Sequence, residues 1–320
     1  MKTNGRKRTA AAVIGLMFVL TPAAAPALAK EKYEEKFAKT ESLDRAGKVQ
    51  IFNISGTIEV KSWGENQVKI DAVKVSQADS LDKAKENAAQ VTIEVTKTGN
   101  ILRIETKYPD GKLRRNNNLN VSVNYVIQVP DKAAVKLRNV SGSVDLASLG
   151  GPVEVDVTSG TVKVASAAQG ADLRTVSGTI TATDVTGDAD LKTVSGTIKA
   201  ERIKGSVAAE TTSGGIELAD ITEARSIRAK VLSGYVRYDG TIVAGGRYSL
   251  EALSGTIEVR LPASAAFDLE AETFSGKIQT DFPITVSGTV SPKEMRGTVG
   301  GGGATLRVKS FSGGVKIIKK

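Results

Sequence analysis

The chain has 320 residues and a formal net charge of +9, with no His and no Cys. The lack of Cys excludes disulfides and thiolate metal sites. The small charge excess and an aromatic content of 4% argue against a nucleic-acid surface, which needs clustered basic and stacking side chains.

Residues 1–29 have the features of a secretory signal peptide. A basic start precedes an apolar run over residues 10–20, and Ala27-Leu28-Ala29 fits cleavage before Lys30. The run is about half the length that crosses a bilayer, so we expect cleavage and no membrane span afterwards. Cleavage would leave 40 Lys and Arg against 35 Asp and Glu, a net charge of +5. The sequence predicts export to the periplasm, the cell surface or the medium, and no nucleic-acid partner.

Residues 30–135 are expected to form an N-terminal β-rich capping region. The segments 48–76, 91–106 and 119–129 are predicted as strands. One short helix is predicted near residues 79–90, with Asp79 or Ser80 as its N-cap. Its expected apolar face consists of Leu81, Ala84, Ala88 and Ala89.

A Ser-Gly pair recurs at a nearly constant spacing through residues 136–320. The spacing is 18 residues at first and then 20 or 21. A repeat of this length is typical of one coil of a β-solenoid, because a single coil cannot bury its apolar face but stacked coils can. The repeated serines, with one earlier copy and one later copy, are Ser55, Ser141, Ser159, Ser177, Ser195, Ser213, Ser233, Ser254, Ser275 and Ser312. The predicted fold class is therefore all-β, a β-solenoid of short two-strand coils with a period of 18–21 residues.

Alignment of the copies on the serine predicts which side chains face inward. Three places after the serine stand Val144, Val162, Ile180, Ile198, Ile216, Val236, Ile257, Ile278 and Val315. Four places before it stand Leu137, Val155, Leu173, Leu191, Ala209, Ala229, Leu250, Ala271 and Val308. Since strands alternate with a period of two, both columns are predicted to be buried. The position three places before the serine is charged in all nine of these copies and is predicted to form an outward ladder whose signs alternate at most steps.

The glycine after each serine is expected to form a corner. Glycine adopts positive φ without a Cβ penalty and lets backbones approach closely, and the serine can bond a backbone group across the corner. A second corner is predicted at Gly150-Gly151, Gly170, Gly187 and Gly205. Catalysis by the serines is excluded, because the nine equivalent copies from Ser141 to Ser312 would each need a base and the chain has no His.

The repeat is interrupted at residues 281–303, which contain two prolines and a run of four glycines. This C-terminal insertion is predicted to cover the end of the solenoid, since an open sheet edge invites pairing with other chains. One more repeat-like unit follows it within the solenoid region.

Three acidic residues, Asp184, Asp188 and Asp190, raise the alternatives of a calcium site or polysaccharide-lyase chemistry. Their spacing fits neither an EF-hand loop nor a Gly-Gly-x-Gly-x-Asp repeat. We therefore predict no metal, no cofactor and no catalytic residue.

The chain contains the motif Ile54-Ser55-Gly56-Thr57-Ile58-Glu59-Val60 with Trp63, the segment Tyr125 to Pro130, the repeated Val-Ser-Gly-Thr-Ile, and a glycine run before a final Ser-Gly strand. Together these features resemble the DUF4097 family, described as putative adhesins. The resemblance covers nearly all of residues 46–320. It implies a bacterial β-solenoid with an envelope or surface role and supplies no catalytic or ligand residues.

The sequence thus predicts a non-enzymatic exported β-solenoid that acts as an envelope or cell-surface scaffold or adhesion module. Its expected partners are a cell-envelope glycan, peptidoglycan or another envelope protein. Two alternatives remain open. An acidic cluster with Arg or Lys in a groove would favour a β-helix carbohydrate-active enzyme, and indefinite growth in solution would favour a self-assembling filament subunit.

Overall fold

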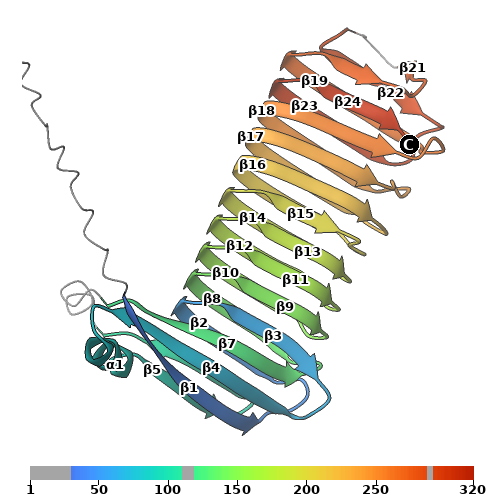
Figure 1. The fold of residues 1–320 in the computed structure, drawn as a ribbon. Coiled ribbons are helices and arrows are strands. Elements are labelled where there is room, and N and C mark those ends of the chain that lie inside the picture. The colour runs from blue at the N-terminus through green and yellow to red at the C-terminus, as the bar shows by residue number, and fades with distance from the viewer. Residues whose placement is uncertain (1–29, 110–118, 287–290) are drawn as a thin grey trace, which may run out of the picture.

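The computed structural model describes residues 30–109, 119–286 and 291–320 as an elongated stack of β-coils with a β-rich region at one end (Figure 1). Each coil has two strand segments joined at the Ser-Gly corner. We call the stacked segments before the corner the first wall and those after it the second wall. The fold is the predicted all-β solenoid with one short helix in its N-terminal region.

The regular part of the solenoid pairs neighbouring coils in parallel and in register. Val162 lies opposite Ile180 on the second wall, and Leu173 lies opposite Leu191 on the first. The last three strands of this part continue through the corner and contribute to both walls. The strands are β8 (Ala134–Ser141), β9 (Val144–Leu149), β10 (Val153–Ser159), β11 (Val162–Ala167), β12 (Ala171–Ser177), β13 (Ile180–Val185), β14 (Ala189–Ser195), β15 (Ile198–Glu201), β16 (Val207–Ile221), β17 (Ser226–Gly240) and β18 (Arg247–Leu261).

The interior of the solenoid is built from the two predicted inward columns. Every member of both columns is buried, and Val162, Ile180 and Ile198 have no exposed surface. Burying such a side chain contributes about 1.5–3 kcal/mol, and the columns repeat this in every coil. The predicted inside and outside assignment is confirmed at these positions.

The Ser-Gly corner requires glycine because the backbones of successive coils nearly touch there. Gly160 has φ 144°, and a Cβ on it would lie 2.1 Å from the carbonyl oxygen of Gly142. Its amide donates a 3.0 Å hydrogen bond to the carbonyl of Ser177 in the next coil. The corner glycines thus permit the close stacking that the sequence predicts.

A buried residue two places before each serine closes the same corner from inside. Asn139 donates from Nδ2 to the carbonyls of Ser141 (3.2 Å) and Gly56 (3.3 Å), and Ser310 donates to Gly255 (3.0 Å). The serine is the side chain that the sequence pattern predicts to bond across the corner. These bonds come instead from a different column, which the sequence pattern does not single out.

Replacing Thr193 in this column with Val is expected to leave the free energy of unfolding unchanged or to raise it by up to about 1 kcal/mol. Thr193 is 6% exposed, and its hydroxyl has no hydrogen-bond partner in the described structure. Val157 and Val231 already occupy equivalent positions. Asn139→Leu should instead cost about 1–3 kcal/mol, because it removes bonds to corner carbonyls. Equal losses for both variants in urea unfolding would contradict this account.

In the N-terminal region, spatial order differs from chain order. Strands β2 and β3 form the first coil; β2 lies between β6 and β8, and β3 lies between β7 and β9, all in parallel. Beyond this coil, β5, β4 and β1 add antiparallel strands. The elements are β1 (Glu31–Ser42), β2 (Lys48–Ser55), β3 (Ile58–Trp63), β4 (Gln67–Ala78), α1 (Leu81–Ala89), β5 (Thr92–Thr98), β6 (Ile101–Lys107) and β7 (Val121–Pro130).

The helix α1 begins where the sequence indicates, with Ser80 as the N-cap accepting a hydrogen bond from the amide of Lys83 (3.3 Å). Its buried face is formed by Ala84, Asn87 and Ala88. The predictions for Leu81 and Ala89 are wrong. Leu81 is 42% exposed, because it stands at the first helical position, before the turn that packs on the sheet, and Ala89 at the last position is exposed as well.

At the C-terminal end, the last repeat in the sequence is not the last in space. Strands β23 and β24 insert between β18 and the coil of β19 and β20, so both of their edges are paired. The insertion 281–303 contributes β22, which pairs antiparallel with β19. The strands are β19 (Phe267–Ser275), β20 (Ile278–Thr280), β21 (Thr285–Val286), β22 (Glu294–Val299), β23 (Thr305–Ser312) and β24 (Val315–Lys319).

The two ends of the stack are therefore finished by antiparallel strands. At one end, β1 is rich in Lys and Glu and mostly exposed, a composition that discourages edge-to-edge pairing. At the other end, β22 covers β19. The predicted signal peptide at residues 1–29 lies outside the described residues. Within the described part of the chain, no helix has the length and hydropathy to cross a bilayer.

Candidate interaction surfaces

The outward face of the first wall carries three columns of side chains, each running along the stack in the spatial order of the coils. The charge ladder, three places before each serine, is Arg138, Asp156, Arg174, Lys192, Glu210, Lys230, Glu251, Lys309 and Glu272. The outer column, five places before, is Lys136, Glu154, Asp172, Asp190, Ala208, Arg228, Ser249, Arg307 and Glu270. The apolar stripe, one place before, is Val140, Thr158, Val176, Val194, Thr212, Leu232, Leu253, Phe311 and Phe274.

The charge ladder alternates in sign at every step except Arg174 to Lys192. In chain order Glu251 would precede Glu272, but the inserted last repeat places Lys309 between them. Arg138 pairs with Asp156 (3.4 Å) and Lys309 with Glu272 (2.8 Å). These pairs are well exposed, so each is worth a few tenths of a kcal/mol and serves register more than stability.

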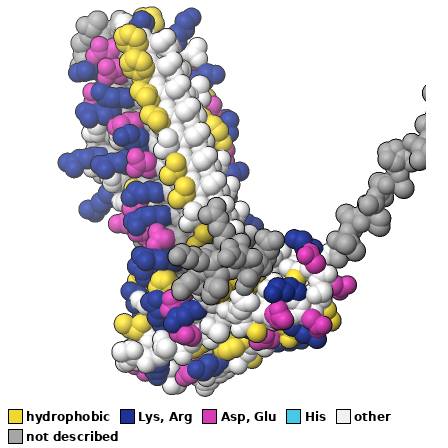
Figure 2. Space-filling model, turned by 90° about the vertical axis from the view of Figure 1, so that its left-hand side faces the viewer, with side chains coloured by type: hydrophobic (Ala, Val, Ile, Leu, Met, Phe, Trp, Pro, Cys, Tyr) yellow, Lys and Arg dark blue, Asp and Glu magenta, His cyan; other side chains and the backbone are white. Residues whose placement is uncertain are grey.

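The apolar stripe runs beside the ladder along the corner (Figure 2). Its seven hydrophobic members are 47–66% exposed, and the rings of Phe311 and Phe274 stack with their centroids 4.9 Å apart. This column was not predicted from the sequence. The available signal was an apolar residue recurring at a position that strand alternation places outward.

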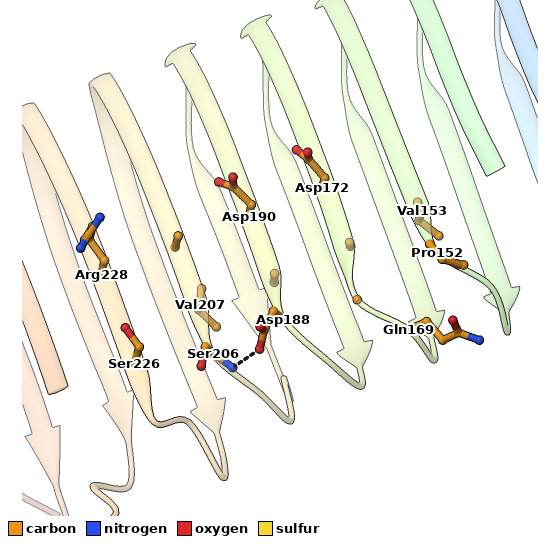
Figure 3. A pocket seen from close by; sticks show the side chains of 14 residues that line it. Pro152, Val153, Gln169, Asp172, Asp188, Asp190, Ser206, Val207, Ser226 and Arg228 are labelled. Carbon is orange, nitrogen blue, oxygen red and sulfur yellow. Dashed lines mark hydrogen bonds between the residues drawn. The ribbon is translucent and has the colours of Figure 1, made fainter. Parts of the chain in front are cut away.

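A hollow of about 650 Å³ lies on the first wall, near the second corner (Figure 3). Asp172 and Asp190 stand side by side in it on adjacent strands, and Arg228 lies two coils beyond Asp190. Each aspartate is paired along its own strand, Asp172 with Arg174 (2.8 Å) and Asp190 with Lys192 (2.8 Å). Their Oδ1 atoms are buried and have no hydrogen-bond partner in the described structure.

The three aspartates considered for a calcium or lyase site do not converge. Asp184 forms a two-pronged pair with Arg202 (2.7 and 3.0 Å), and Asp188 accepts from the amide of Ser206 (3.0 Å). Asp190 is held by Lys192. Within the described residues, no group of three or more acidic side chains is arranged to hold a metal ion.

The paired aspartates of the hollow are poorly placed for glycoside hydrolysis. That chemistry needs two carboxyl groups on opposite sides of the scissile bond, about 5–9.5 Å apart. Asp172 and Asp190 project from the same sheet face, one coil apart, which is about 4.8 Å. They can therefore bind a ligand from one side only.

Replacement of Asp172 and of Asp184 by Asn should change the stability of the fold in opposite directions. Burial raises the pKa of the Asp172 carboxyl; Arg174 opposes this and Asp190 adds to it. Folding thus disfavours its ionised form above the ordinary pKa of 3.8, and the cost disappears at lower pH. Asp172→Asn is expected to raise the melting temperature at pH 7 and to have little effect at pH 3.

Asp184 is the matched control, because hydrogen bonding to Arg202 lowers the pKa of its carboxyl. Its contribution is present above the unfolded pKa and is lost as the pH falls through the folded value. Asp184→Asn should therefore lower the melting temperature at pH 7 and have a smaller effect at pH 3. The same sign for both variants at pH 7 would contradict these assignments.

The outward face of the second wall is polar and carries no stripe of this kind. We call it the polar face; it consists of the residues two and four places after each serine: Ser143, Asp145, Thr161, Lys163, Thr179, Thr181, Thr197, Lys199, Gly215, Glu217, Tyr235, Arg237, Thr256, Glu258, Gly314, Lys316, Lys277 and Gln279.

Near the middle of the polar face, several side chains form a linked cluster. Tyr235 donates to Glu217 (2.6 Å), Lys199 lies 3.4 Å from Glu217, and the guanidinium of Arg237 lies 4.7 Å from the Tyr235 ring centroid. The hydrogen bond from Tyr235 is the main cause of the lowered pKa of Glu217. This arrangement offers fixed hydrogen-bond donors and acceptors on an extended surface.

Several solved structures are similar to this chain at low sequence identity. A putative adhesin from Bacteroides fragilis NCTC 9343 is 13% identical, with 88% of this chain and 97% of that chain covered and a TM-score of 0.34. A putative adhesin from Parabacteroides merdae ATCC 43184 is 9% identical, with coverage of 89% and 96% and a TM-score of 0.37. A putative lipid binding protein from Parabacteroides distasonis ATCC 8503 is 12% identical, with coverage of 90% and 96% and a TM-score of 0.34.

All three TM-scores lie below 0.5. No curated protein matches the sequence significantly. The family model described as Toastrack DUF4097 matches residues 47–318, which is nearly the whole of the described solenoid and its N-terminal region. The chain belongs to the Toastrack DUF4097 family.

Proposed function

We propose that this protein is a non-enzymatic, exported scaffold or adhesion module of the cell envelope or surface. The observation that carries the proposal is the polar face, an outward surface that repeats hydroxyl and charged side chains coil after coil on a rigid support. Successive coils repeat about every 4.8 Å, so this surface suits an extended polar polymer better than a compact small molecule. The proposed partner is an envelope glycan, with peptidoglycan first.

Rigidity supports the same function. The core columns are continuous and both ends are finished by antiparallel strands, so the solenoid can act as a spacer that holds a fixed surface. The end strands also weigh against the filament alternative, because the outer edge of β1 is lined with Lys and Glu, a composition that discourages end-to-end pairing.

The test is binding of the purified chain to isolated peptidoglycan and envelope glycans. Lys163→Glu with Lys199→Glu changes the polar face, and Lys85→Glu with Lys97→Glu makes the same change on exposed residues of α1 and β5 in the N-terminal region. We expect the first pair of substitutions to weaken binding and the second to leave it intact. Failure of the unaltered chain to bind any envelope fraction would overturn the proposal.

The hollow gives the carbohydrate-active alternative its one specific support, since Asp172, Asp190 and Arg228 line it together. That alternative predicts release of reducing ends from envelope glycans and its loss in Asp172→Asn. The non-enzymatic proposal predicts no release in either protein.

A further inference from the structure

The apolar stripe exposes seven hydrophobic side chains in one line, with charged residues along one side (Figure 2). Exposed apolar surface rimmed by polar residues marks an interaction site. We propose that the stripe joins two copies of this chain, packed antiparallel about a two-fold axis that passes through the coil of Thr212. The polar face then remains open on both copies.

The sizes of the side chains along the stripe favour this arrangement. Before Thr212 the stripe holds Val and Thr, and after it Leu and Phe. In the antiparallel pair each smaller residue meets a larger one, whereas in a parallel pair Phe would meet Phe and Val would meet Val. The facing residues are Val194 with Leu232, Val176 with Leu253, Thr158 with Phe311, and Val140 with Phe274. Such complementarity is what a well-packed interface needs.

The charge ladder is complementary to itself in the same register. Six of its nine positions face an opposite charge on the second copy, in the pairs Arg138 with Glu272, Asp156 with Lys309, and Arg174 with Glu251. At the centre Lys192 meets Lys230 and Glu210 meets its own copy. Each of these lies one row, about 4.8 Å, from an opposite charge on the other copy, so the centre is a mixed cluster.

The outer column gives independent support. Its facing residues of opposite charge are Lys136 with Glu270, Glu154 with Arg307, and Asp190 with Arg228, and no like charges meet. The Asp190 side chain is 38% exposed and its Oδ2 already pairs with Lys192 (2.8 Å), so the guanidinium of Arg228 from the second copy would add a second cation beside this carboxylate.

Other registers and orientations lose these matches. A shift by one row in either direction brings Arg174 onto Lys230 or onto Lys309. A two-fold axis parallel to the stack would place the charge ladder over the uncharged Ser-Gly corner. A shift by two rows, centred on Val194, keeps six ladder positions opposite a countercharge, but it sets Asp190 against its own copy and leaves Phe311 and Phe274 without facing residues. The antiparallel register centred on Thr212 therefore matches size and charge best.

A second copy fits this surface better than a glycan or a membrane. The rings of Phe311 and Phe274 are parallel within 4° and cover each other's faces, and Lys293 lies 5.8 Å from the Phe274 centroid. They therefore offer a sugar no open stacking platform. The alternating ladder gives no net attraction to an anionic lipid surface.

The contact is large enough for a specific dimer. Nine coils span about 40 Å, and three columns span about 14 Å. The pair would bury about 1,100 Å² in total, near the lower bound for a stable interface. A reversible dimer is therefore expected, with a dissociation constant that sedimentation equilibrium can measure.

Sedimentation equilibrium of the purified chain, with no envelope material present, tests the surface. Leu253→Glu is expected to raise the dimer dissociation constant at least about tenfold, because it puts an unpaired charge into the contact. Val126→Glu on β7 is the matched control, since Val126 is 49% exposed and Leu253 is 50% exposed. A monomer at all concentrations, growth beyond a dimer, or equal effects of the two substitutions would overturn the proposal.

Disulfide formation tests the register, since the chain has no Cys of its own. Thr212→Cys lies at the proposed axis and should form an intermolecular disulfide under mild oxidation. Thr158→Cys, in the same column, would be about 29 Å from its own copy and should not. Efficient cross-linking at Thr158, or none at Thr212, would overturn the antiparallel register. Neither experiment depends on the envelope partner, so its result is separate from that of the glycan-binding test.

Discussion

Gly196→Ala is expected to destabilise the solenoid by about 3 kcal/mol or more. Gly196 has φ 149°, and a Cβ there would lie 1.9 Å from the carbonyl oxygen of Gly178. A methyl group must therefore push two coils apart, and the 2.9 Å bond from the Gly196 amide to Ser213 would be lost with them. Because each coil is stabilised by its neighbours, the damage should spread through the stack. Urea unfolding and amide hydrogen exchange measure it.

Gly64→Ala is the control for this substitution. Gly64 is exposed, and no atom lies within 4 Å of the position of its added Cβ. Its effect should stay within about 0.5 kcal/mol. If Gly196→Ala were equally mild, the corner would tolerate a side chain, and close stacking of the coils would not be the reason for glycine at this position.

The regular coils could be predicted from the sequence because their information is local. Each repeat has an aliphatic residue three places after the serine and another four places before it, and these positions indicate which face is buried. The constant spacing indicates that the coils stack in register. The corner glycines carry the same kind of signal. These are the positions at which the structure agrees with the prediction.

The order of the coils at the two ends could not be predicted. The repeats around Ser55 and Ser312 resemble the others, and nothing within a repeat states which neighbours it pairs with. In the structure β2 has partners from residues 101–107 and 134–141, and β23 has partners from 247–254 and 268–275. Such pairing depends on contacts between segments that are far apart in the sequence, and the pattern within one repeat does not encode these contacts.

The candidate surfaces were predicted only in part. The charge ladder followed from alternation, but its full regularity depends on Lys309 entering between Glu251 and Glu272. The apolar stripe was visible as a column in the sequence, yet its meaning depends on the same order, which brings Phe311 onto Phe274. The candidate metal residue Asp184 is separated from Asp188 and Asp190 because it turns toward Arg202 at the second corner, where it has φ 55°.

Ile198→Asp is expected to destabilise the central coils by about 4–5 kcal/mol. Ile198 has no exposed surface and lies in register between Ile180 and Ile216, so a carboxylate there would be buried among aliphatic side chains without a partner. The adjacent coils share the lost contacts, and unfolding should begin there. Hydrogen exchange of β13, β15 and β16, together with the melting temperature, measures the effect.

Lys199→Asp tests the neighbouring residue with the same new side chain. Lys199 faces outward and lies 3.4 Å from Glu217, so the substitution removes an exposed ion pair and introduces a repulsion. Surface charge changes of this kind cost about 1 kcal/mol or less. The difference in melting temperature between the two variants thus compares a buried position with the adjacent exposed position on the same strand. Equal melting temperatures would mean that the aliphatic column is not the dry core on which the stacking of the coils, and with it every surface described above, depends.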